Sequence, residues 1–311
     1  MVDNKKRNKH LLQILNSFKK KMHRQLKNIV RIFSIILKDR KGILGVTIIG
    51  IILCCAIFSP WIAPCNPYEL NIINRFAAPS LKHLLGTDNL GRDILSRIIY
   101  GARIAMIVSI GGVSIAVVVG VILGTIAGYN VGRVIDNGIL WIVDVIRAFP
   151  QIILILVLVA VLGPSTLNMI MVLALTAMPR YTRVARAETL SIKEEEYIFA
   201  AKSLGAKNKR IILKHIIPNI LPPIIILAGM DMAVMIMIEA GLSFLGLGVR
   251  PPTASWGIIL RDGYRYIRLS PWMIIWSSIA IAMAMLGYSL FAESLRIALN
   301  PKESIEKQAG V

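Results

Sequence analysis

Acidic residues, cysteines and histidines are scarce in this 311-residue chain. Only 17 Asp and Glu residues stand against 36 Lys and Arg, which gives a formal net charge of +19. The three cysteines, Cys54, Cys55 and Cys65, include an adjacent pair and cannot form an even disulfide framework. They are interpreted as small apolar residues, with lipidation as the alternative. No histidine stands at metal-ligand spacing from another, so no metal site is expected at His10, His23, His83 or His215.

Catalytic motifs are absent as well. The sequence contains no phosphate-binding GxxxxGK[ST] loop, no nucleophile elbow and no HExxH zinc motif. We therefore expect no enzyme activity and no cofactor in this chain, and any ATP-driven work would be done by another subunit. Charge is sparse too, at 17% of residues, whereas 56% are hydrophobic. This composition predicts lipid as the main solvent. Basic residues flank apolar runs without interleaved aromatics, which argues against nucleic-acid binding.

Six apolar segments predict an all-α integral membrane protein with six transmembrane helices. Residues 43–63 carry no charge and would span about 30 Å as a helix, which is one bilayer core. Pro150 is expected to kink the third segment. The remaining segments are 104–128, 134–162, about 166 to beyond 179, 220–247 and 272–291.

The distribution of basic residues predicts the orientation. With both termini in the cytoplasm, the cytoplasmic pieces hold 25 Lys and Arg and the outside loops hold 8. The outside loop should contain an amphipathic helix at 86–103 that lies on the outer membrane face, with Asp93 and Arg97 as an i,i+4 pair. The expected regions are a basic cytoplasmic region 1–42, a first transmembrane helix 43–63, an extracytoplasmic loop 64–101, a core 102–298 with five transmembrane helices and a cytoplasmic loop at about 180–219, and a cytoplasmic tail 299–311.

Small residues recur every four positions in the second span. This spacing places them on one stripe, where another helix can approach closely, although membrane helices also tolerate glycine in general. The predicted packing residues are Gly112, Ala116, Gly120 and Gly124.

Two acidic residues lie inside the fifth span. Asp231 and Glu239 are eight residues apart on roughly the same face, with Met235 between them. Ionisable groups in lipid are costly and usually face a cavity or a partner. We expect these three residues to line a translocation path, where the acids would suit a cationic cargo; the alternative is a buried hydrogen bond to a neighbouring helix. The methionines around Asp231 are interpreted as adaptable filler.

A short amphipathic helix is predicted in the cytoplasmic loop, after the acidic run 194–196. Tyr197, Ala201 and Leu204 share one face, whereas Phe199 points the opposite way. A large aromatic side chain on the second face predicts that something covers it, either the lipid surface or a partner protein.

Three stretches together resemble a known family. They are GTDNLGRDILSRIIYGARIAM at 86–106, EYIFAAKSLGAKNKRIILKHIIPNILPPII at 196–225 and EAGLSFLGLGVRPPTASWGIIL at 239–260. From about residue 30 to 302 the chain resembles the inner-membrane permeases of ATP-binding-cassette (ABC) importers, most closely the second permease of the dipeptide, oligopeptide and nickel branch. The resemblance implies a type I ABC importer permease fold in the plasma or inner membrane of a bacterium or archaeon.

The resemblance also implies a coupling helix that a partner ATPase holds in a surface groove. The family pattern Glu-Ala-Ala, three residues, then Gly falls on Phe199, Ala200, Ala201 and Gly205, so an apolar side chain replaces the glutamate. Glu196 could supply the acidic contact instead. The coupling residues carried over are Glu196, Tyr197, Phe199, Ala200, Ala201, Gly205, Ala206, Arg210, His215, Pro218 and Asn219.

The partners implied are a second permease of the same fold, two ATPases that bind ATP and Mg²⁺, an external substrate-binding protein and membrane lipid. The mechanism implied is alternating access, with di- or oligopeptides as cargo, or nickel or another metal chelate as the alternative. A secondary transporter or channel is the rival class and would need its own coupling-ion site. A purely structural scaffold would leave Asp231 and Glu239 without a role.

Overall fold

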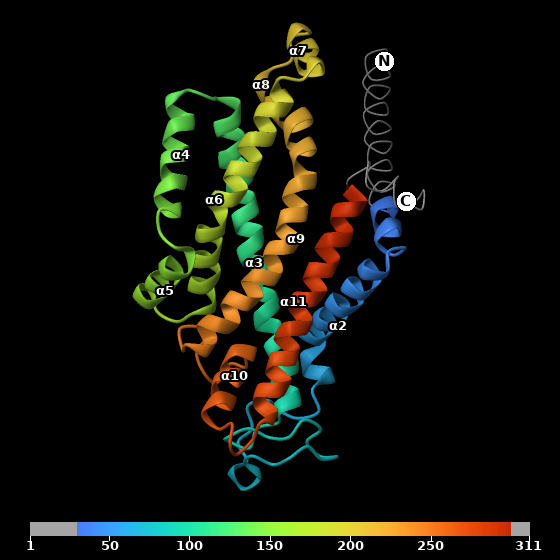
Figure 1. Ribbon diagram of the computed structural model, residues 1–311, viewed down its shortest axis with the longest axis vertical. Coiled ribbons are helices and arrows are strands. Elements are labelled where there is room, and N and C mark those ends of the chain that lie inside the picture. The colour runs from blue at the N-terminus through green and yellow to red at the C-terminus, as the bar shows by residue number, and fades with distance from the viewer. Residues whose placement is uncertain (1–29, 300–311) are drawn as a thin grey trace, which may run out of the picture.

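The computed structural model describes residues 30–299, which form an elongated bundle of long helices (Figure 1). Within this range the backbone pairs in extended form only at a single bridge between Thr87 and Asp93, so the all-α prediction is confirmed. The predicted regions 1–42 and 299–311 lie largely outside the described residues. The helices are α2 (Arg40–Ile62), α3 (Ile94–Tyr129), α4 (Val134–Arg147), α5 (Gln151–Leu162), α6 (Thr166–Lys193), α7 (Glu196–Ser203), α8 (Asn208–Ile211), α9 (Ile217–Phe244), α10 (Trp256–Arg265) and α11 (Trp272–Leu299), with short turns η1 (Ile72–Asn74) and η2 (Ile212–Ile216).

Four of these helices are long and apolar enough to cross a membrane. They are α2, α3, the continuous run Asn208–Phe244 and α11. They contain the segments predicted at 104–128 and 272–291, and they cover those predicted at 43–63 and 220–247 up to Ile62 and Phe244. The pair α4 and α5 could form a fifth span. Helix α6 begins at Thr166 as predicted, but its second half carries Arg180, Arg183 and Arg186. The count of six spans and the orientation of the termini therefore stay predictions.

The predicted third span, 134–162, consists of two separate helices and not of one kinked helix. Helix α4 ends at Arg147, α5 begins at Gln151, and the two axes are bent by 86°. Pro150 stands at the break, with extended backbone immediately before α5. Proline has no N–H to continue the helix and keeps the preceding residue out of helical backbone, so both effects end α4 here.

The prediction of an amphipathic helix at 86–103 is wrong for the first half of that range. Residues 86–93 form turns, and helix begins only at Ile94, where it continues directly as α3. Asp93 caps α3 by accepting from the Ser96 backbone N–H at 2.8 Å and so is not the partner of Arg97. The guanidinium of Arg97 instead lies 3.4 Å from Asp88. The tight turns at 86–93 bring Asp88 within reach, which helical spacing alone did not reveal.

Helices α3 and α6 pack together more extensively than any other pair. All four predicted packing residues of α3 are buried. A Cβ atom added at Gly120 would meet the Tyr181 Cβ at 2.5 Å, and one at Gly124 would meet the Ala185 Cβ at 2.6 Å. Gly112 instead faces α9, where the Met235 sulfur would lie 2.8 Å away. The absence of side chains at these positions is what lets the backbones of α3 and α6 approach.

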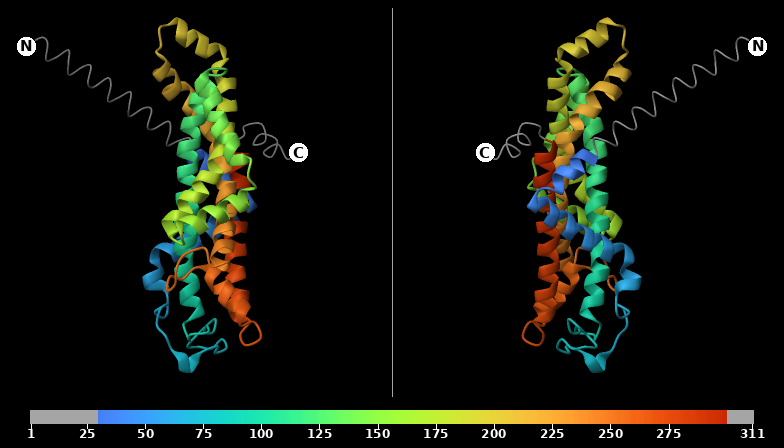
Figure 2. Two further views of the ribbon diagram at one scale, coloured as in Figure 1. Left: turned by 90° about the vertical axis from the view of Figure 1, so that its left-hand side faces the viewer. Right: turned by 90° about the vertical axis from the view of Figure 1, so that its right-hand side faces the viewer.

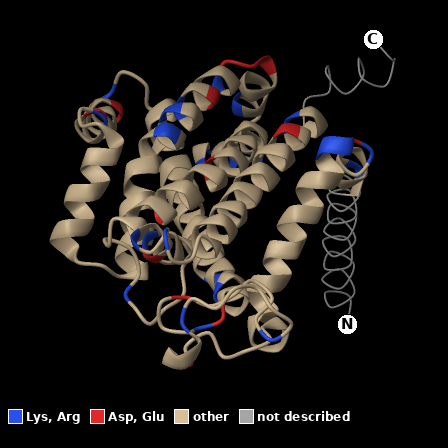
Figure 3. Ribbon diagram, turned by 60° about the horizontal axis from the view of Figure 1, so that its bottom comes forward, with Lys and Arg blue, Asp and Glu red and all other residues tan. Residues whose placement is uncertain are grey.

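The two ends of the bundle differ in structure. Helix α7 stands at one end, whereas α10 and the loop between α2 and α3 stand at the other, and the side views show the same separation (Figures 1 and 2). Most of the helix length between these ends carries no charged residue, and the charges gather in loops and at helix ends (Figure 3). This pattern is typical of a membrane protein that exposes a polar surface at each end.

Candidate functional site

Helix α7 extends beyond the rest of the bundle at its end (Figures 1 and 2). One side chain, Ile198, anchors it: this residue is fully buried in a cluster that includes Ile211, Ile216 and Ile220 of the following helices. Residues of α3 and α6 belong to the same cluster. Helix α7 is therefore packed, through this one side chain, against the helices that contain the membrane spans.

Three large apolar side chains are exposed on α7 and on the residue that follows it. The exposed fractions are 44% for Tyr197, 53% for Phe199 and 89% for Leu204. We expected Tyr197 and Leu204 to lie on the face opposite Phe199, and Ile198 was not expected to anchor the helix. The helix is too short to bury a full stripe, so one side chain holds it and the others stay outside. Three large apolar side chains on so short a segment define a candidate docking surface.

The turn after α7 depends on Gly205. Its φ of +79° lies in the left-handed region, which a residue with a Cβ rarely adopts. Its N–H donates to the Lys202 carbonyl at 2.9 Å, and the Ala206 N–H donates to the Ala201 carbonyl at 3.0 Å. A Cβ at Gly205 would meet no atom within 4 Å. The glycine is thus required by the backbone turn and not by packing inside this chain.

Two of the downstream residues carried over from the family, His215 and Asn219, contact Tyr197 of α7. The rings of Tyr197 and His215 are 6.2 Å apart, and Asn219 donates to the His215 carbonyl at 2.6 Å. Pro218 stands in the first turn of α9, directly after the turn η2. The structure thus brings the eleven predicted coupling residues together at one end of the molecule.

A cavity opens beside the break between α4 and α5. It has a volume of about 370 Å³ and is lined by Arg147, Gln151, Thr176 and Arg180 among others. A smaller space of about 90 Å³ shares Gln151, Thr176 and Arg180 and reaches Asp231 and Met235 on α9. Because the break turns α5 away from α4, it leaves room at this level between α4, α5 and α6. The two spaces are the candidate section of the translocation path.

Asp231 lines the smaller space but is not a free acid. Its carboxylate accepts a hydrogen bond from Arg180 at 2.6 Å, so the pair presents both signs of charge to the cavity. Met235 also lines this space, although its side chain is almost entirely buried against α3. Arg147 adds a second guanidinium to the larger space. The cavity is therefore more cationic than the predicted acidic wall.

Glu239 lines neither of these two spaces, and it matches the alternative that we gave for it, a buried hydrogen bond to a neighbouring helix. It is 1% exposed and accepts hydrogen bonds from Ser243 at 2.8 Å and from Ser255 at 2.9 Å. Ser255 also caps α10, so Glu239 joins α9 to the start of α10. Eight residues advance a helix by about 80° beyond two full turns, which is enough to place Asp231 and Glu239 on different faces.

The sequence did not predict three of the residues that line the cavity, namely Arg180, Gln151 and Thr176. Arg180 follows Pro179 and was counted with the cytoplasmic loop, although it lies in the middle of α6. One signal could have found it, because an acid inside an apolar span requires a counter-charge on a neighbouring helix. No pattern in the sequence signalled Gln151 or Thr176, which become neighbours only through the 86° bend.

The described residues form an all-helical domain with several helices apolar enough to cross a membrane and a cavity between α4, α5 and α6. In fold it is similar to the MetNI methionine ABC transporter in an inward-facing conformation, with a TM-score of 0.50 and 19% identity over 67% of this chain and 96% of that one. It is also similar to an amino acid ABC transporter crystallised with histidines, with a TM-score of 0.50 and 18% identity over 65% and 94% of the two chains. The fold is thus that of a type I ABC importer permease.

Residues 120–305 match the family of binding-protein-dependent transport system inner membrane components, and residues 30–79 match the N-terminal transmembrane domain of oligopeptide transport permease C. The chain belongs to this permease family. It is 42% identical over 265 residues to the dipeptide transport system permease protein DppC of Alkalihalophilus pseudofirmus, covering 85% of this chain and 87% of that one.

Two further relatives differ in the cargo that their names give. The oligopeptide transport system permease protein OppC of Bacillus subtilis is 34% identical over 85% of this chain and 86% of its own length. The nickel transport system permease protein NikC of Escherichia coli is 33% identical over 83% of this chain and 93% of its own length. This chain is accordingly a multi-pass inner membrane subunit of an ABC importer, and family membership removes the support for a secondary transporter or a channel.

Proposed function

We propose that this chain forms half of the translocation path of an ATP-driven importer of di- or oligopeptides. In this proposal a second permease of the same fold supplies the other half, and two ATPase subunits bind ATP and Mg²⁺. A substrate-binding protein delivers the cargo at the end that contains α10. The termini and α7 lie in the cytoplasm. The observation that carries the coupling role is the exposed apolar surface of Tyr197, Phe199 and Leu204 on a helix anchored by Ile198.

The chemistry of the cavity favours a peptide as the cargo. A peptide carries a carboxylate and an ammonium group, and the cavity offers Arg147 together with the Arg180–Asp231 pair. Two guanidinium groups against one paired carboxylate repel a bare divalent cation, which argues against free nickel. Cargo of net negative or zero charge suits the same cavity, so an anionic metal chelate is the second candidate. Selectivity would still be shared with the binding protein.

Uptake measurements test the cargo directly. Cells with and without this gene would receive labelled dipeptide, labelled oligopeptide and radioactive nickel in parallel. We expect loss of peptide uptake only, with nickel uptake unchanged. Loss of nickel uptake alone would overturn the peptide assignment. Peptide uptake that survives when the ATPase subunits are inactivated would overturn the ATP-driven mechanism.

The Phe199→Ala variant tests the docking surface. Because aromatic side chains at the centre of an interface typically contribute about 2 kcal/mol, we expect the permease to bind its ATPase about thirty-fold more weakly. The matched control is Ile267→Ala, since Ile267 is 50% exposed but lies between α10 and α11 at the opposite end. Affinity would be measured with purified subunits in detergent. Equal affinity for both variants and the unmodified chain would contradict a docking role for Phe199.

A further inference from the structure

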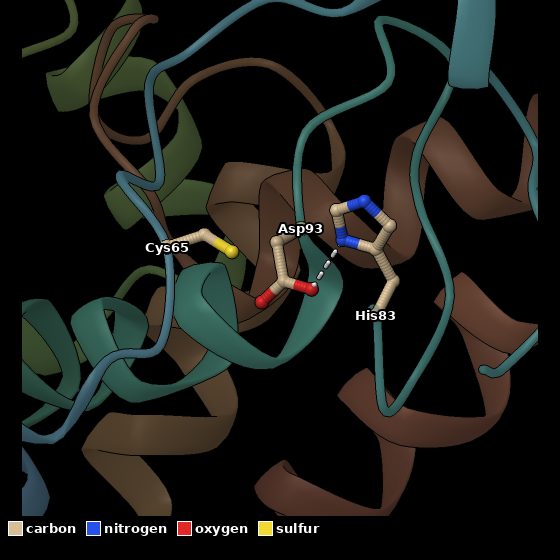
Figure 4. Close-up of side chains that lie close together, drawn as sticks. All are labelled: Cys65, His83 and Asp93. Atoms are coloured by element: carbon tan, nitrogen blue, oxygen red, sulfur yellow. Dashed lines mark hydrogen bonds and ion pairs between the residues drawn. The ribbon is translucent and has the colours of Figure 1, made fainter. Parts of the chain in front are cut away.

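Three side chains with metal-binding atoms meet in the loop between α2 and α3. The ligand atoms of Cys65, His83 and Asp93 all lie within 4.8 Å of one another. The Asp93 carboxylate lies between the other two side chains, with the Cys65 sulfur on one side and the His83 ring on the other (Figure 4). The nearest pair is His83 Nδ1 and Asp93 Oδ1, at 3.1 Å. We predicted no metal site from the sequence, because these residues are 18 and 10 positions apart and only the fold brings them together.

The hydrogen bonds that Asp93 and Cys65 make to Ser96 do not occupy their ligand atoms, and a bound ion would replace the hydrogen bond between His83 Nδ1 and Asp93 Oδ1. Asp93 uses Oδ2 to accept from the Ser96 backbone N–H and hydroxyl, at 2.8 Å and 2.7 Å, so Oδ1 stays directed at His83. Cys65 is a free cysteine, and its backbone N–H donates to the Ser96 hydroxyl at 3.1 Å. A carboxylate fixed by other hydrogen bonds is the arrangement that holds metal-binding ligands in orientation.

A small pocket of about 120 Å³ lies at the same place. Its lining includes Cys65, His83 and Asp93, and also Glu69, Asn66 and Lys82. The volume suffices for an ion with one or two water molecules. The two carboxylates outweigh the single lysine, so the pocket favours a cation.

Steric and chemical features both agree with one ion. Donor atoms that each lie about 2.1 Å from a zinc ion are about 3.0–3.5 Å apart, which matches the 3.1 Å between His83 and Asp93. The Cys65 sulfur would move by about 1 Å to complete the set, given a Zn–S distance of about 2.3 Å. One thiolate, one imidazole and one carboxylate suit a borderline ion, whereas Ca²⁺ and Mg²⁺ require oxygen ligands only.

We propose that Cys65, His83 and Asp93 bind one divalent transition-metal ion, with Zn²⁺ as the best match and a water molecule as the fourth ligand. The His83 ring would ligate through Nδ1, with its proton on Nε2. The ion would cross-link the segment after α2, the loop at 80–86 and the first turn of α3. It would thereby stabilise the loop at the end of the molecule where α10 lies. This site is separate from the cavity and from α7, and it does not depend on the proposed cargo.

Metal binding by the purified full-length chain tests the site. The protein would be prepared in detergent with an affinity tag that contains no histidine, stripped with a chelator and titrated with Zn²⁺, and separately with Co²⁺. We expect one ion per chain and a thiolate-to-cobalt charge-transfer absorption band. Limited proteolysis of the 63–93 loop should be slower when Zn²⁺ is present.

Three variants separate this site from adventitious binding. Cys65→Ala should weaken Zn²⁺ binding by about tenfold or more and abolish the charge-transfer band. The matched control Cys54→Ala removes an exposed thiol in α2 and should change neither. Asp93→Asn keeps a residue that can cap α3, so it should weaken binding in a folded chain. Absence of saturable binding in the unmodified chain, or equal binding by Cys65→Ala, would overturn the proposal.

Discussion

The Gly205→Glu variant is expected to lose ATP-driven uptake while the chain remains folded in the membrane. Gly205 ends the turn after α7 and is exposed beside Leu204, and a Cβ there would touch nothing within the chain. The loss of folding free energy within this chain therefore comes only from the backbone, because a residue with a Cβ at a φ of +79° costs about 1–2 kcal/mol. The bulky charge projects from the surface that we propose to seat in the ATPase, and burying an unpaired charge there is strongly unfavourable.

Two control variants separate backbone strain from blocked docking. Asparagine tolerates the left-handed conformation, so Gly205→Asn preserves the turn and adds a neutral side chain. Gly205→Ala adds strain with almost no volume. We expect uptake to fall in the order Gly, Ala, Asn, Glu, whereas amounts of protein in the membrane stay similar. Transport at the normal rate by Gly205→Glu would contradict the docking assignment, whatever the controls did.

The sequence predicted those features that depend on local spacing. Four small residues at intervals of four, from Gly112 to Gly124, were sufficient to predict a packing face, because every helix places such residues on one stripe. The segment after the acidic run 194–196 likewise predicted a short helix, and the structure has α7 at Glu196–Ser203, followed by a positive φ at Gly205. Long uncharged runs likewise predicted the four helices that are long and apolar enough to cross a membrane.

Features that depend on a rotation or on a long-range contact could not be predicted. Proline signals an interruption, but neighbouring helices determine whether the chain bends by 30° or by the observed 86°. The rotation of α9 decides that Asp231 faces Arg180 and the cavity while Glu239 faces Ser255. The cluster of Cys65, His83 and Asp93 requires the whole loop to fold back on α3.

The charged residues inside the bundle also support the proposal that the cavity beside Arg180 and Asp231 belongs to the translocation path. The bilayer penalises every ionisable group, so a charged residue persists in a span only where it has a partner or water. Arg180 and Asp231 are each other's partner, because they meet at 2.6 Å, and both side chains line a cavity. Glu239 has buried hydroxyl partners and no cavity. The first arrangement is typical of a transport path, and the second is typical of a structural joint.

The Gly124→Leu variant is expected to destabilise the folded bundle strongly, because no space exists for a side chain there. Even a Cβ at Gly124 would collide with the Thr182 carbonyl and lie 2.6 Å from the Ala185 Cβ. The Thr182 carbonyl belongs to the backbone of α6, so α3 and α6 would have to separate. These two helices form the most extensive helix–helix contact among the described residues. Overpacking typically costs about 1–3 kcal/mol, and a contact with backbone over four more carbon atoms should reach or exceed the upper value.

Gly50→Leu is the matched control for this prediction. Gly50 also lies inside a membrane-spanning helix, α2, but a Cβ there would meet no atom within 4 Å. Both variants add the same side chain to an apolar helix, so only the closeness of a neighbouring helix differs. We expect the midpoint temperature of thermal unfolding in detergent to fall sharply for Gly124→Leu. It should decrease less for Gly124→Ala and change little for Gly50→Leu. Equal stability of the two leucine variants would show that α3 and α6 are not held at the observed distance.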